Sequence, residues 1–101
     1  MGATSRAGRV RDVVVTAQPD ETLLASIAVL RHLGARITRY DAEAGLLEAR
    51  VRRFLRPALI RLHAEPEGAA TRLRVESDAL GWAPMFRRFR GGLLHVVNGA
   101  S

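Results

Sequence analysis

Arginines alternate with apolar residues along several segments of the chain, and this spacing would bring their guanidinium groups together on one face of a β-sheet. A guanidinium group is a planar fork that pairs with two oxygens of a carboxylate or a phosphate, so the pattern predicts contact with an anion. Tyr40 would add a ring that can stack on a base. The residues predicted to bind an anionic partner are Arg36, Tyr40, Arg50, Arg52, Arg61, His63, Arg72 and Arg74.

The same alternation is typical of a sheet face that is simply exposed to water. Glu48, Glu65 and Glu76 fall on the same side of the predicted strands, where cross-strand Arg–Glu pairs each stabilise a sheet by about 0.2–1 kcal/mol. Tyr40 is the only aromatic residue predicted on this face, whereas domains that bind single-stranded RNA usually place several rings among their basic residues. A surface for self-association or for a protein partner is therefore an alternative to nucleic-acid binding.

The overall charge agrees with an anionic partner without selecting one. The chain has 16 basic and 10 acidic side chains, which gives a net charge of +6, and all of the basic residues counted are arginine. It has no cysteine, which excludes disulfides and Cys-based zinc sites. The N-terminus lacks the apolar core of a secretory signal, and no apolar run approaches the roughly 18 residues that span a bilayer. We therefore expect a cytoplasmic protein that is not embedded in a membrane.

The segments that carry these residues are predicted to be strands, accompanied by two helices. A proline and two carboxylates at residues 19–21 favour the start of a helix, because proline fits the first turn and carboxylates stabilise the positive end of the helix dipole. Gly34 is suited to end this helix. A second helix is expected from Pro84 to Val97, where the glycine pair at 91–92 would either kink it or allow close packing on the sheet. The predicted strands are residues 10–16, 35–41, 46–54, 58–65 and 71–78.

Apolar residues mark the faces that these elements should bury. In the strands the buried set is Ile37, Leu47, Ala49, Val51, Ile60, Leu62, Ala64, Leu73 and Val75. In the helices it is Leu23, Leu24, Ile27, Leu30 and Leu33, then Met85, Phe86, Phe89, Leu93, Val96 and Val97. Arg39 and Arg53 interrupt the aliphatic set of the strands, so we expect both near strand ends.

These patterns predict an α+β fold with two layers: one antiparallel sheet in the order β-α-β-β-β-β-α, with two helices on one face. Residues 10–98 would form this single domain, preceded by a flexible N-terminal tail at residues 1–9. The order of elements resembles that of TATA-binding-protein-like and helix-grip folds, which include the polyketide-cyclase and lipid-transfer group. The helix-grip resemblance implies a curved sheet around a helix, and a cavity for an apolar ligand between the sheet and the last helix.

A more local resemblance is to small bacterial domains of unknown function. It is carried by the helix from Thr22 to Gly34, the hairpin from Tyr40 to Ala49, and the strand Thr71 to Ser77. Those domains have a Gly/Lys/Asn-rich start to the last helix, whereas this chain has Ala-Pro-Met-Phe at residues 83–86. The resemblance implies the fold and no activity.

Residues that could support catalysis or bind a metal are sparse. His63 with Glu65, and Glu76 with Asp78, are the only pairs in which a general acid and base would share a face of a strand. No spacing places two histidines on one side of an element, so no metal site is expected. We expect no enzyme and no cofactor.

The sequence thus favours a non-enzymatic binding or assembly module that uses an Arg-rich sheet face to contact an anionic partner, either nucleic acid or an acidic protein. The alternatives are a helix-grip-type carrier of a small apolar ligand and a structural homo-oligomer. An enclosed cavity of roughly 300 Å³ or more would favour the carrier. An exposed apolar patch would favour the oligomer.

Overall fold

The computed structural model describes residues 9–52, 57–78 and 82–98. The elements are β1 (Arg9–Val15), α1 (Pro19–His32), β2 (Ala35–Asp41), β3 (Leu46–Arg52), β4 (Pro57–Glu67), β5 (Ala70–Ser77) and α2 (Trp82–Asn98). The predicted α+β class and the order β-α-β-β-β-β-α are confirmed. Arg9, which was expected in the tail, begins β1. The rest of the predicted tail, and Arg53 and Phe54 from the predicted third strand, lie outside the described residues.

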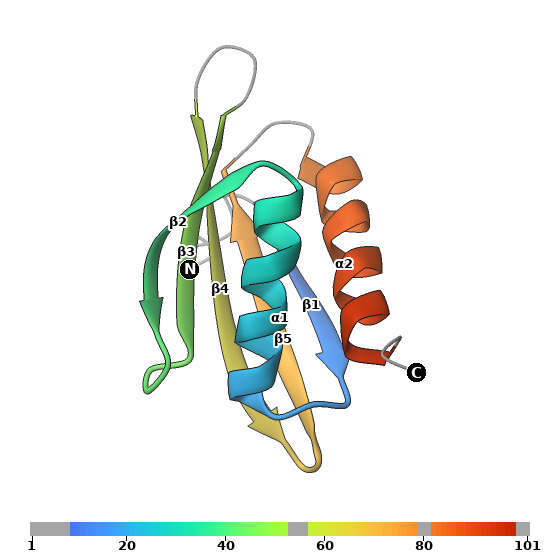
Figure 1. Cartoon of the computed structure of the whole chain (residues 1–101). Helices are drawn as coiled ribbons and strands as arrows, with labels where there is room; N and C mark the ends of the chain where they lie inside the picture. Colours follow the sequence, from blue (N-terminus) through green and yellow to red (C-terminus); the bar gives the residue numbers. More distant parts are fainter. Residues whose placement is uncertain (1–8, 53–56, 79–81, 99–101) are drawn as a thin grey trace, which may run out of the picture.

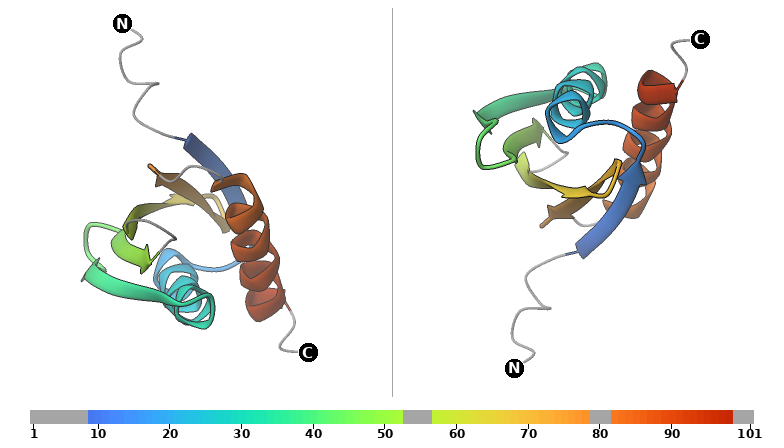
Figure 2. Two further views of the ribbon diagram at one scale, coloured as in Figure 1. Left: turned by 90° about the horizontal axis from the view of Figure 1, so that it is seen from above. Right: turned by 90° about the horizontal axis from the view of Figure 1, so that it is seen from below.

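The five strands form one antiparallel sheet in the order β1-β5-β4-β3-β2. The first strand therefore pairs with the last one, and β1 and β2 form the two edges. Both helices cover the same face, with α1 over the middle of the sheet and α2 beside β1 (Figure 1). Among the described residues, no helix lies on the opposite face, as the views along the strands show (Figure 2). We call the helix-bearing side the inner face and the other side the outer face.

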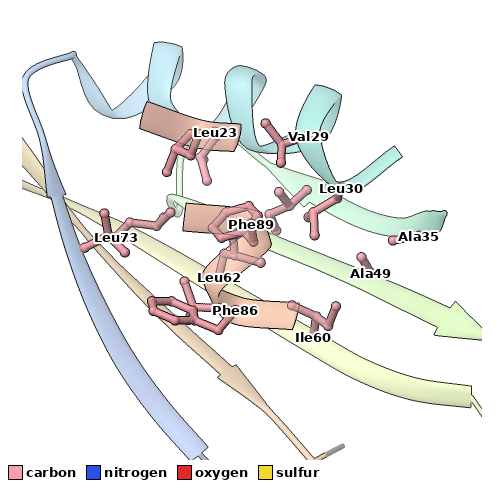
Figure 3. Packing of buried hydrophobic residues seen from close by; sticks show 14 of the residues in the cluster. Leu23, Val29, Leu30, Ala35, Ala49, Ile60, Leu62, Leu73, Phe86 and Phe89 are labelled. Atoms are coloured by element: carbon pink, nitrogen blue, oxygen red, sulfur yellow. The ribbon is translucent and has the colours of Figure 1, made fainter. Parts of the chain in front are cut away.

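The inner face holds the core. The aliphatic residues predicted for β3, β4 and β5 are all buried, whereas Ile37 in β2 is half-buried. Phe89 of α2 and Leu30 of α1 are almost fully buried between the helices and the strands, close to Leu62 (Figure 3). The predicted direction of the aliphatic side chains of the strands is thus confirmed, whereas Val96 of α2, which was expected in the core, is 44 % exposed.

Helix α1 begins as the sequence predicts but buries a different stripe. The backbone N–H of Gln18 donates to the Glu21 carboxylate at 3.3 Å and thereby caps the first turn. Leu24, expected in the core, is 55 % exposed, whereas Thr22 and Ser26 are fully buried. The hydroxyls of Thr22 and Ser26 donate to carbonyl oxygens one turn earlier, at 2.9 and 2.8 Å, which removes the cost of burying them. The buried stripe is therefore rotated towards the small hydroxylated residues.

Helix α2 runs without interruption past its glycine pair. A Cβ atom at Gly92 would lie 2.9 Å from Cγ1 of Val29, whereas one at Gly91 would meet no atom within 4 Å. Gly92 therefore allows α2 to approach α1 closely. The sequence suggested either a kink or close packing on the sheet, and the close contact is with the neighbouring helix instead.

Candidate anion-binding site

The outer face of the sheet carries the charged side chains that the alternation predicts. Directly opposite residues on neighbouring strands share a face, so the register determines which charges meet. On β3 and β4, Glu48 lies opposite Arg61, and on β4 and β5, Glu65 lies opposite Arg72. On β5 and β1, Arg74 lies opposite Asp12. The arginines on β4 and β5 are therefore each matched with an acidic residue.

Arg72 is held by two carboxylates. Its guanidinium Nε is 2.6 Å from Oε1 of Glu67, and its Nη1 is 3.1 Å from Oδ2 of Asp12. The hydrogen bond from Arg72, reinforced by its charge, lowers the pKa of the Glu67 carboxyl. The hydrogen bonds to Glu67 and then to Asp12 raise the pKa of Arg72. The positive charge of Arg72 is thus largely neutralised by its own neighbours.

Acidic side chains also contact the other predicted contact residues of β4 and β5. The guanidinium Nε of Arg61 is 3.0 Å from Oε2 of Glu48, and that of Arg74 is 3.7 Å from Oδ1 of Asp12. Nδ1 of His63 is 3.4 Å from Oε2 of Glu65. This part of the outer face therefore matches the interpretation of an ordinary solvated surface with cross-strand pairs.

The other part of the outer face is a basic cluster formed by Arg36, Arg50 and Arg52. Arg36 on β2 lies directly opposite Arg50 on β3, and Arg52 follows two residues further along the same side of β3. All three side chains are exposed. Within residues 9–52, 57–78 and 82–98, none of the three forms an ion pair with a carboxylate. Their neighbours on β4 are Leu59 and Pro57, which carry no charge.

A β-bulge changes the composition of this face. The pairing of β2 with β3 shifts between Ile37 and Arg39, so Arg39 lies opposite Glu48 and Tyr40 lies opposite Leu47. Leu47 is fully buried on the inner face. Tyr40 therefore belongs to the inner side, and the prediction that it shares a face with the arginines is wrong. The extra residue in the bulge reverses the alternation beyond it.

The bulge also brings Arg39 to the outer face, beside the basic cluster. From the alternation alone, Arg39 is expected on the same face as the aliphatic residues, where it interrupts them. The only local hint is the run of polar residues at 38–41, which does not keep the period of two. A bulge depends on how two strands pair, so a period read along one strand does not locate it.

The two candidate acid–base pairs both lie at the surface of the molecule. His63 and Glu65 contact each other, but their side chains are 42 % and 49 % exposed, so water competes for both. Glu76 and Asp78 line an open hollow of about 240 Å³ with Leu59, Arg61 and Ser77. There Oδ1 of Asp78 accepts a hydrogen bond from the backbone N–H of Leu59 at 3.0 Å, which fixes the start of β4 against the end of β5.

Other site classes find no support in the part of the chain that the structure describes. No three histidine or acidic side chains in it come together as potential metal ligands. No helix in it is both long and apolar enough to cross a membrane. A comparison with known protein families and with curated proteins found no match to this chain.

Proposed function

We propose that this protein is a non-enzymatic binding module whose outer sheet face contacts a polyanion, with the basic cluster of Arg36, Arg50 and Arg52 as the contact site. The observation that carries the proposal is the direct opposition of Arg36 and Arg50 without a carboxylate partner among the described residues. Like charges directly opposite each other destabilise a sheet. A bound anion would remove that repulsion.

Phosphate is the anion that best fits these side chains. A guanidinium group binds phosphate oxygens through two parallel hydrogen bonds, and adjacent strands hold Arg36 and Arg50 at about the 5 Å spacing of opposed residues. The cluster lies on an open sheet face, which suits an extended chain of phosphates better than an enclosed small molecule. We therefore propose a nucleic-acid backbone as the partner and place the protein in the cytoplasm.

The proposal includes no stacking on bases. Tyr40, the ring expected for that role, lies opposite Leu47 on the inner side of β2. Binding through arginine–phosphate contacts alone is independent of base sequence and weakens steeply as salt is added. We expect this type of binding, with little difference between sequences of equal length.

The interior weighs against the apolar-ligand alternative. Phe89, Leu30 and Leu62 fill the space between the helices and the sheet and are at most 1 % exposed. An apolar hollow of about 390 Å³ between Leu24 and Val96 opens to solvent. A carrier of the helix-grip type would need an enclosed space instead.

The test measures the binding of labelled single- and double-stranded DNA and RNA by fluorescence anisotropy at several salt concentrations. The triple variant Arg36→Gln, Arg50→Gln, Arg52→Gln should lose most of the binding. For duplex DNA the slope of log affinity against log salt should fall by about 0.9 for each phosphate contact removed.

The matched control is Arg61→Gln, Arg72→Gln, Arg74→Gln. It removes the same number of charges from the same face, but from arginines that already contact carboxylates. We expect it to bind far more tightly than the cluster variant. Equal loss in both variants would show that net charge alone drives binding and would overturn the assignment to the cluster. Binding of polyglutamate but not of nucleic acid would identify an acidic protein as the partner, and binding of neither would end the proposal.

A further inference from the structure

The two edges of the sheet differ in how they are protected. Edge strands present unpaired N–H and C=O groups, and proteins usually block them with bulges or charged side chains. Edge β2 has a bulge at residue 38 and carries Arg36 and Arg39 on the outer side. Edge β1 pairs with β5 from Arg9 to Val15 without any shift in register. The edge β1 is thus a regular strand of seven residues.

The outer side of β1 carries two exposed valines and one charged residue. Val10 is 56 % exposed and Val14 is 47 % exposed, on either side of Asp12. Exposed β-branched residues on a regular edge strand favour the addition of another strand. From these features we infer that β1 pairs antiparallel with β1 of a second copy of this chain, joining two sheets into one continuous sheet. This inference does not depend on the anion-binding proposal.

The sequence of β1 selects one register for this pairing. In a symmetric antiparallel pair that continues one sheet, residues directly opposite each other must lie on the same side of that sheet. This requires the twofold axis to pass through a residue position and not between two residues. An axis at Arg11 would set two arginines against each other and leave Val14 without an apolar partner. An axis at Val13 would set Asp12 against Val14. An axis at Asp12 sets Val10 of each copy against Val14 of the other, so all four exposed valines are paired.

The charges at the centre of this register are already compensated. Asp12 of one chain would lie opposite Asp12 of the other, and these two carboxylates alone would repel each other. Asp12 is bonded to Arg72 at 3.1 Å and lies 3.7 Å from Arg74, so the two carboxylates would stand among four guanidinium groups. The centre of the interface would therefore carry a network of arginines and carboxylates, with valine pairs on both sides.

The first experiment measures molar mass by light scattering over a range of protein concentrations. The wild-type protein should be a dimer that dissociates on dilution, and Val10→Lys, Val14→Lys should be a monomer with an unchanged circular dichroism spectrum. The control Leu24→Lys, Val96→Lys changes two other exposed apolar residues and should leave the dimer intact. A monomer at every concentration, or a dimer that persists in the β1 variant, would overturn the inference.

The second experiment tests the register and does not require lysine variants to fold. Because the chain has no cysteine, single variants Val10→Cys and Val14→Cys can be oxidised separately and as a mixture. The mixture should form disulfide-linked dimers between the two variants, and each variant alone should form few, since the two copies of one position lie several residues apart. Equal cross-linking in the separate samples would contradict the Asp12-centred pairing.

Discussion

Arg72 and Arg50 carry the same charge on the same face, but their neighbours give them different roles. Arg72 contacts Glu67 and Asp12, whereas Arg50 faces Arg36 and an uncharged Leu59. An arginine whose hydrogen bonds are used by carboxylates has less to offer a phosphate. The residues best able to bind an anion are therefore those whose cross-strand neighbours are not acidic.

The Arg72–Glu67 pair leads to a prediction about stability and pH. Because the folded state lowers the pKa of Glu67, this carboxylate stabilises the fold above the pKa of an unfolded glutamate, about 4.3. The contribution is lost as the pH falls through the lowered, folded-state pKa. Wild-type protein should thus be more stable than Glu67→Gln at pH 7, and the difference should vanish in acid.

Urea unfolding at a series of pH values would measure this difference. The control is Glu43→Gln, an exposed residue in the turn between β2 and β3. A gap between wild type and Glu67→Gln that stays constant down to the most acidic condition would show that the ion pair is not its origin.

At the scale of elements, the contact between α1 and α2 depends on a missing side chain. Gly92 faces Val29 at a distance that leaves no room for a Cβ atom, whereas Gly91 faces open space. Both glycines lower the intrinsic stability of the helix, by about 1 kcal/mol each relative to alanine. Only the one at 92 is required by packing.

Alanine substitutions should separate these two effects. Gly91→Ala should stabilise the protein by up to about 1 kcal/mol, because it improves helix propensity without a clash. Gly92→Ala should lose this gain to steric overlap with the stiff Val29 side chain, since overpacking typically costs about 1–3 kcal/mol. Thermal or urea unfolding measures both.

A double-mutant cycle identifies the partner of Gly92. In a Val29→Ala background the extra methyl has space, so Gly92→Ala should become stabilising relative to that background. If the effect of Gly92→Ala is the same in both backgrounds, the contact with Val29 is not its cause.

At the scale of the whole molecule, α1 is the element that links the other parts. It contacts β2, β3, β4, β5 and α2. Its inward residues therefore stabilise the entire domain, and its outward residues affect little beyond the helix itself. Two leucines of this helix represent the two cases: Leu30 points inward and is 1 % exposed, whereas Leu24 points outward and is 55 % exposed.

Leu30→Ala should lower the free energy of unfolding by about 2–5 kcal/mol, because it removes a fully buried side chain and leaves a cavity. Leu24→Ala should change it by no more than about 0.5 kcal/mol, as is usual for an exposed position. Chemical denaturation compares the two. Similar costs at both positions would show that the helix is turned differently from the arrangement described here.

The arrangement of the two edges also has a consequence for the whole molecule. The basic cluster lies on β2 and β3, at the opposite side of the sheet from β1. Two copies joined through β1 would share one outer face and carry a basic cluster near each end of it. Two linked sites on one polyanion bind more tightly than one.

The sequence alone determined the class of fold, the order of elements and the split into an aliphatic and a charged face. These features follow from local periodicities and from turn and cap residues such as Gly34 and Gly45, whose positive φ angles of 92° and 68° suit glycine. The tertiary structure decided which arginines are neutralised, because an ion pair depends on the register between strands that are distant in the chain. It also placed Tyr40 on the inner side and Arg39 on the outer one, because a bulge is a property of two paired strands. Thr22 and Ser26 became core residues for a similar reason: local hydrogen bonds to the helix backbone let them replace Leu24 where α1 meets the sheet.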